Sequence, residues 1–141
     1  MGNDFKYQET GKRHPDTVSY DDQNELKKIG NHPNKITSIR VWSSEYIVGI
    51  EVYYDGVSAG ARMGSEYSKG VVHHDFFLKN DEDIKKVYGR SGDLIDMVGF
   101  KTTKGREVTF GSGKGGTKFN LKDPSGGIVQ GFKVGFGGHL H

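Results

Sequence analysis

Apolar residues alternate with polar ones in short runs along most of this chain, and glycine-containing turns separate the runs. Residues 36–41 and 46–54 form two such runs around the polar stretch 43–45, a pattern typical of a β-hairpin. Asp55-Gly56 then supplies a tight turn dipeptide. The pattern predicts paired antiparallel strands in this part of the chain.

The same arrangement returns in residues 84–100 and again in residues 128–141. The three turns open at Ser44, Gly92 and Gly137, which are 48 and 45 residues apart (92 − 44 and 137 − 92). Self-similarity at a nearly constant period is the signature of a repeated supersecondary unit. The chain is therefore predicted to contain three copies of one unit.

Each copy would form a sheet of about four strands, which cannot enclose a core alone. Three such sheets with their apolar faces inward make a prism with pseudo-threefold symmetry. We expect a single all-β domain over residues 1–141, with a less regular N-terminal segment over 1–35. The acidic run 81–83 is also compatible with the cap of a helix. The run that follows it is short and reaches glycine at Gly89, which favours a strand.

Composition supports this fold class. The chain of 141 residues has 22 Gly, 7 Tyr and 8 Phe but only 3 Pro, as expected for a turn-rich β protein. Disorder is the alternative for a chain of mean hydropathy −0.67, but the apolar residues are patterned. There is no cysteine, which excludes disulfides and thiolate chemistry, and a net charge of +2 gives no reason to expect nucleic-acid binding. No apolar run has membrane-spanning length, and no signal peptide opens the chain, which leaves its localisation undetermined.

Two stretches carry candidate chemistry. Residues 92–96 form a tight turn with a carboxylate at its end, and residues 111–116 form a glycine loop with unobstructed backbone N–H groups. Carboxylate oxygens and bare N–H groups in one shallow cup suit a neutral polyol. The sequence therefore predicts a sugar site made of Gly92, Asp93, Leu94, Asp96, Gly113, Lys114, Gly115 and Gly116.

Other chemistries are less well supported. The glycine loop superficially resembles a phosphate loop, but its lysines stand in the wrong order and no helix is expected to follow. His73 and Asp75 would share one face of a strand, as would His139 and His141, yet two ligands do not make a metal site. We expect no metal, no cofactor and no catalytic residue.

Taken in order, these stretches resemble the jacalin-related lectins, whose fold is the β-prism I, with three Greek-key sheets of four strands. The resemblance covers about residues 36–141 and implies glycan binding without catalysis, metal or cofactor. Non-catalytic recognition of mannose- or glucose-type glycans is what it implies for this chain. The resemblance is carried by residues 36–54, 84–87, 92–96, 99–106, 110–119 and 128–132.

The sugar-binding loop of that family has the form G-x-x-x-D. The second unit keeps it with Gly92 and Asp96, whereas the first has Ser44 and Val48 at those places. Most single-chain members hold their principal sugar in the third unit, where the acidic position is His141 here, and imidazole cannot replace a bidentate carboxylate. The resemblance thus implies only a weaker second site at Gly137, Gly138, His139 and His141.

The family also continues past the third loop with one more strand, whereas this sequence ends at His141. We expect that strand to be missing or supplied by another segment or chain, which would make a homo-oligomer or strand exchange possible. Two alternatives stay open beside a lectin. One is a degenerate domain that binds protein or assembles with itself, and the other is the glycan-targeting domain of a larger toxin or secreted protein. No membrane insertion is expected.

Overall fold

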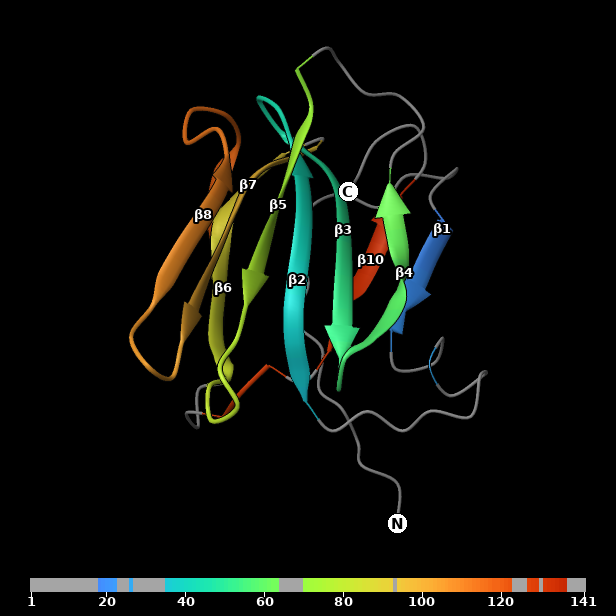
Figure 1. Cartoon of the computed structure of the whole chain (residues 1–141). Helices are drawn as coiled ribbons and strands as arrows, with labels where there is room; N and C mark the ends of the chain where they lie inside the picture. The colour runs from blue at the N-terminus through green and yellow to red at the C-terminus, as the bar shows by residue number, and fades with distance from the viewer. Residues whose placement is uncertain are drawn as a thin grey trace.

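The computed structural model describes residues 18–22, 26, 35–63, 70–92, 94–122, 127–129 and 131–136. Ten β-strands are found there, arranged in three antiparallel sheets. Figure 1 shows β6, β7 and β8 on one side of the molecule and β5, β2 and β3 in the centre. The pair β1–β10 lies on the other side, next to β4.

The first sheet has the strand order β4-β3-β2-β5 and contains the predicted hairpin. Its strands are β2 (Ile36–Ser43), β3 (Ile47–Tyr54), β4 (Val57–Met63) and β5 (Val72–Phe77). Asp55 and Gly56 join β3 to β4 with φ angles of 50° and 81°. Positive φ at both central residues marks the type I′ turn that matches strand twist, so the predicted turn is confirmed.

The second sheet has the equivalent order β8-β7-β6-β9. Its strands are β6 (Ile84–Ser91), β7 (Ile95–Thr102), β8 (Glu107–Gly111) and β9 (Thr117–Lys122). In both sheets the fourth strand returns to pair beside the first, which is the Greek-key arrangement. Residues 84–91 form a strand, so the helix considered after the acidic run is excluded.

The first two units repeat residue by residue. Ile84 corresponds to Ile36 and Ile95 to Ile47, an offset of 48 in both cases (84 − 36 and 95 − 47). The β2–β3 pair has register shifts at 36/38 and 42/43, and the β6–β7 pair has them at 84/86 and 90/91. Because the bulges recur at the same offset, the predicted repeat is confirmed for these two units.

The third sheet is described as two strands, β1 (Val18–Asp21) and β10 (Lys133–Phe136). Within the third repeat predicted over residues 128–141, the strand thus begins only at Lys133. Val129 and Phe132 instead pack against the buried core, and the Val129 N–H donates to the Ile84 carbonyl at 2.7 Å. This segment runs beside the start of β6 before it pairs with β1, which explains the late start.

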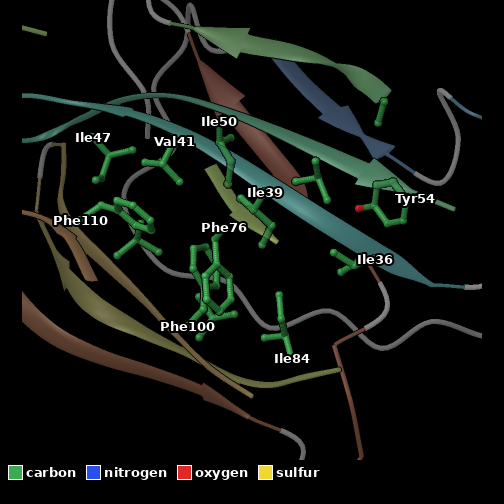
Figure 2. Packing of buried hydrophobic residues seen from close by; sticks show 14 of the residues in the cluster. Ile36, Ile39, Val41, Ile47, Ile50, Tyr54, Phe76, Ile84, Phe100 and Phe110 are labelled. Atoms are coloured by element: carbon green, nitrogen blue, oxygen red, sulfur yellow. The ribbon is translucent and has the colours of Figure 1, made fainter. Parts of the chain in front are cut away.

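The core lies between the two four-stranded sheets, as Figure 2 shows. Phe76, Phe100 and Phe110 meet there, and the ring centroids of Phe100 and Phe110 are 6.4 Å apart and tilted by 60°. Alternate residues of a strand point to opposite faces, so each sheet keeps an outer face that this core does not use. The other buried members are Leu26, Ile36, Ile39, Val41, Ile47, Ile50, Val52, Tyr54, Ala59, Ile84, Val87 and Val98.

A buried carboxylate anchors the second sheet. Glu82 is fully buried, and Arg106 donates to it from Nε at 2.8 Å and from Nη2 at 2.6 Å. The Thr102 hydroxyl and the Lys79 N–H add bonds of 2.7 and 2.9 Å. These hydrogen bonds, that of Arg106 first, outweigh desolvation and lower the pKa of Glu82 from 4.5 to about 2. The β5–β6 connection is thereby tied to the turn between β7 and β8.

A second polar node joins the sheets near the chain ends. The Tyr54 hydroxyl donates to the buried Asp22 carboxylate at 2.7 Å and accepts the Phe132 N–H at 3.2 Å. The Asp22 N–H in turn donates to the Phe132 carbonyl at 3.0 Å. The segments after β1 and before β10 are thus both attached to β3.

Glu82→Gln is expected to destabilise the protein by about 3 kcal/mol, because the buried amide would place its own donor among groups that themselves donate. Urea unfolding of the two proteins measures this difference. Asp81→Asn is the matched control, since Asp81 pairs with Lys104 at the exposed surface and should change stability little. Equal stability of wild type and Glu82→Gln would contradict the anchoring role.

The depressed pKa of Glu82 also predicts an acid sensitivity. The folded state holds the ionised carboxylate, so its contribution is complete above about pH 5 and is lost as pH falls toward 2. At pH 3 the loss from this group alone amounts to about 2 kcal/mol. Unfolding free energies of wild type and Glu82→Gln, measured from neutral pH to pH 3, should therefore converge. A difference in unfolding free energy between the two proteins that stays constant from neutral pH to pH 3 would contradict the depressed pKa of Glu82.

Candidate functional site

The β6–β7 turn and the β8–β9 loop lie at the same end of the second sheet. Ser91, the last residue of β6, pairs with Ile95 on one side and with Thr117 on the other. The Gly92 N–H closes the turn by donating to the Leu94 carbonyl at 2.9 Å. A Cβ built on Gly92 would lie 3.7 Å from the Cα of Gly116. The structure therefore brings together two stretches that are about twenty residues apart in sequence.

The carboxylate of Asp96 lies against the glycine loop. A Cβ built on Gly115 would be 2.7 Å from Asp96 Oδ1, and one built on Gly116 would be 2.5 Å from Oδ2. Both distances are too short for a real side-chain carbon, so the carboxylate occupies space that the two glycines leave open. Asp96 is half-buried, and its side chain makes no hydrogen bond or ion pair within the described residues. Its acceptor capacity is available to a ligand.

The loop presents backbone donors beside this carboxylate. Ser112 donates its N–H to the Asp96 carbonyl at 2.9 Å, and Lys114 donates its N–H to Ser112 Oγ at 3.3 Å. The N–H groups of Gly113 and Gly115 have no hydrogen-bond partner in the part of the chain that the structure describes. Acceptors and donors thus lie side by side at one sheet edge.

Arg90 holds the loop in place and was not anticipated. Its Nε donates to the Gly115 carbonyl at 2.7 Å and its Nη2 to the Gly116 carbonyl at 3.1 Å. Turning these two carbonyls toward the guanidinium fixes the peptide planes of the loop. The only sequence signal was an arginine two residues before the turn glycine, which is unremarkable by itself.

The remaining predicted residues fall into three groups. Leu94 is half-exposed in the turn, and Lys114 is exposed at the loop, as expected for the rim of a site. Tyr88, on the neighbouring strand β6, is directed away from this rim, because its ring covers Gly99 and its hydroxyl donates to Glu107. Burial and this hydrogen bond raise the pKa of Tyr88 to about 12. Asp93 and the weaker third-unit set, residues 137–141, lie outside the described residues.

The first unit keeps the turn but not the acid. Its Ser44 N–H donates to the Tyr46 carbonyl at 2.9 Å, 48 residues before the Gly92–Leu94 bond. Val48 stands where the second unit has Asp96, and it is 1% exposed. A buried valine offers no acceptor to a sugar, so this loop cannot reproduce the chemistry of the second unit.

The histidines have other neighbours. Asp75 forms a bidentate pair with Arg40, at 2.6 Å to Nε and 3.1 Å to Nη2, and this hydrogen-bonded partner lowers the pKa of Asp75. His73 lies beside Trp42, with ring centroids 6.1 Å apart. No group of three potential metal ligands occurs among the described residues. The same part of the chain has no helix with the length and apolar character that a membrane span requires.

Comparison with known proteins identifies the family. The sequence model of the jacalin-like lectin domain matches residues 7–141. The chain belongs to the jacalin-like lectin family. A comparison with curated proteins found no match. The predicted family and its β-prism I fold are thus both confirmed.

Solved structures extend the comparison. Artocarpin in complex with mannotriose is 25% identical, with a TM-score of 0.70, and the match covers 88% of this chain and 91% of artocarpin. A prostate-specific WGA16 glycoprotein lectin is 23% identical at a TM-score of 0.68, covering 92% of this chain and 86% of that one. Frutalin from Artocarpus incisa, in complex with galactose, is 23% identical at a TM-score of 0.68. That match covers 86% of this chain and 92% of frutalin. The latter two likenesses concern the fold alone.

Gly115→Ala is expected to disturb the arrangement at Asp96 with little loss of stability. The added methyl group would meet the mobile end of one short side chain, which can turn away. Gly113→Ala should have a smaller effect, since its methyl group would meet only the Met97 sulfur at 3.9 Å. Thermal unfolding and the NMR shifts of the Asp96 side chain measure the two consequences. An unchanged Asp96 signal in Gly115→Ala would contradict the close contact.

Proposed function

We propose that this protein is a non-catalytic lectin that binds mannose- or glucose-type glycans at the Asp96 end of its second sheet. The observation that carries the proposal is the half-buried carboxylate of Asp96, unpaired within the described residues and packed against two glycines. Membership of a lectin family supports glycans as the ligand class. The similarity to artocarpin, whose solved complex contains mannotriose, supports the choice of sugar.

Each element has a part in recognition. The two oxygens of Asp96 accept hydrogen bonds from neighbouring hydroxyls, such as O4 and O6 of one hexose ring. The N–H of Leu94, with that of Asp93 beside it in sequence, donates to the ring side and O6, and a glycine-loop N–H donates to O3 or O4. Glycine is needed at position 115 because a Cβ there would occupy the space of the carboxylate.

The affinity expected from this set is modest. Each hydrogen bond exchanges against water, so the net gain is only about 0.5–1.5 kcal/mol per bond. A few such bonds give about −4 kcal/mol, which corresponds to a dissociation constant of roughly 1 mM for a monosaccharide. Tighter binding to a glycan then comes from multivalency.

Nothing in this arrangement requires chemistry on the sugar. Asp96 has no acidic partner in the described turn and loop with which to divide general acid and base roles. The proposed function is therefore recognition, and the ligand leaves unchanged.

The test compares methyl α-mannoside binding to wild type and Asp96→Asn by calorimetry or NMR titration. The amide keeps the shape of the side chain but loses its charge and one acceptor, so the affinity should fall about tenfold or more. Methyl α-galactoside, measured in parallel, should bind more weakly than the mannoside. The unfolding temperature should be nearly unchanged, because the Asp96 carboxylate makes no hydrogen bond or ion pair within the described residues that the substitution could remove.

Asp55→Asn is the matched control. It removes the same charge from an exposed turn, and asparagine tolerates the positive φ of that position. Its mannoside affinity should equal that of the wild type. Sugar binding that survives in Asp96→Asn, or that is absent from the wild type, would reject the site and favour a protein-interaction domain.

A further inference from the structure

The outer face of the second sheet carries two rows of cations. The inner face is apolar, with Val87, Phe100 and Val98 in the core, so the alternate residues form the outer face. In one row, Lys86 of β6 lies directly between Lys122 of β9 and Lys101 of β7. Four residues further along β6, Arg90 pairs with Lys118 of β9 in the second row.

These pairings are unfavourable for the isolated sheet. Residues directly opposite one another across antiparallel strands have Cβ atoms about 4.5–5.5 Å apart, and like charges at that separation destabilise the pair. Lys101 and Lys118 make no ion pair within the described residues. The like-charge pairings of Lys86 with Lys101 and of Arg90 with Lys118 do not by themselves stabilise the sheet.

One carboxylate on this face offsets part of the positive charge. Glu107 lies opposite Lys101, which leaves the charges of Lys86, Arg90 and Lys118 without an acidic residue directly opposite them. Glu107 also accepts the Tyr88 hydroxyl, whose ring lies on the sheet over Gly99. The ammonium group of Lys86 lies over the Tyr88 ring, 5.2 Å from its centroid. Tyr88 thus forms a flat, amphipathic floor between the two rows of cations.

The first sheet, built on the same repeat, has a different outer face. The position equivalent to Arg90 is Trp42, and its neighbour Arg40 is paired with Asp75. Three cations in register across neighbouring strands therefore distinguish the second unit, and the architecture shared by the two units does not require them.

We propose that the outer face of the second sheet binds the sulfate groups of an anionic polysaccharide, with Lys86, Lys101 and Lys118 as the principal contacts. Sulfate groups placed between the two rows of cations reduce the repulsion within each row. Binding also releases the counterions that had neutralised the sulfates of the polyanion, and this release favours the complex. The Arg90–Lys118 row is one residue from the Ser91–Thr117 pair that opens the proposed sugar site. A glycan held at Asp96 can therefore extend along this face.

A sulfated glycan is preferred to a nucleic acid, and this choice rests on the proposed function. The chain as a whole has 20 basic and 18 acidic residues, which is too balanced for the long-range attraction that nucleic-acid binding uses. The cations of the outer face lie beside the candidate hexose site, within reach of a glycan held there. Duplex DNA is accordingly the competing ligand in the test.

The experiment measures binding of dextran sulfate, with unsulfated dextran as its neutral counterpart, to wild type and to the double variant Lys86→Gln/Lys101→Gln. Dextran sulfate should bind more tightly than unsulfated dextran, whose glucose units can occupy the proposed hexose site but offer no anion to the lysines. The double variant should lose roughly tenfold in affinity at low salt, and its slope of log affinity against log salt should fall by about 2. Its mannoside affinity should not change, and its unfolding temperature should stay the same or rise because repulsion is removed.

Two further variants make the result specific. Lys79→Gln/Lys104→Gln removes the same charge from outside the strand face, where Lys104 already pairs with Asp81, and should bind dextran sulfate nearly as well as wild type. Asp96→Asn should lose the mannoside while it keeps dextran sulfate, which separates failure of this proposal from failure of the hexose site. Equal losses in the two double variants, absence of dextran sulfate binding, or tighter binding of duplex DNA would each overturn the proposal.

Discussion

The second sheet depends on the buried Glu82–Arg106 pair. A carboxylate with no exposure to water is tolerable only when its oxygens are fully used, and Arg106, Thr102 and Lys79 together do this. The pair ties the β5–β6 connection to both ends of the β7–β8 turn. Thr102 ends β7, and Asp96 lies near its beginning, so the register set at one end positions the carboxylate at the other.

At the start of β7, near Asp96, the constraint is the absence of side chains in the neighbouring glycine loop. Gly115 and Gly116 leave the volume that the Asp96 carboxylate occupies, and Arg90 holds their carbonyls away from it. The proposed recognition site therefore lies where a strand end meets a loop without Cβ atoms. The arrangement needs no cavity in the core, because backbone groups supply the donors and one side chain supplies the charge.

Much of this could be predicted from the sequence, because the fold repeats. Alternation in residues 36–54 and its return 48 residues later revealed the hairpins, and the shared sheet placed Asp96 and the glycine loop at one edge. Arg90 could not be found this way, since its partners are backbone carbonyls that carry no sequence signal. Glu82 was considered only as part of a helix cap, because an acidic run does not reveal which member is buried. The late start of β10 could not be predicted for a similar reason, because apolar residues that pack as a connection look like those that pair in a strand.

The first unit shows how loosely function and fold are coupled here. Its turn is closed by the Ser44–Tyr46 backbone bond, and the second unit closes its own with the equivalent Gly92–Leu94 bond. Neither bond involves the residue at the acidic position, where Val48 is buried in one unit and Asp96 is half-exposed in the other. Because the backbone makes the turn, its closure does not depend on which residue stands at the acidic position. The proposed sugar site therefore depends on the individual side chain at this position, while the strands and turns of the two units remain the same.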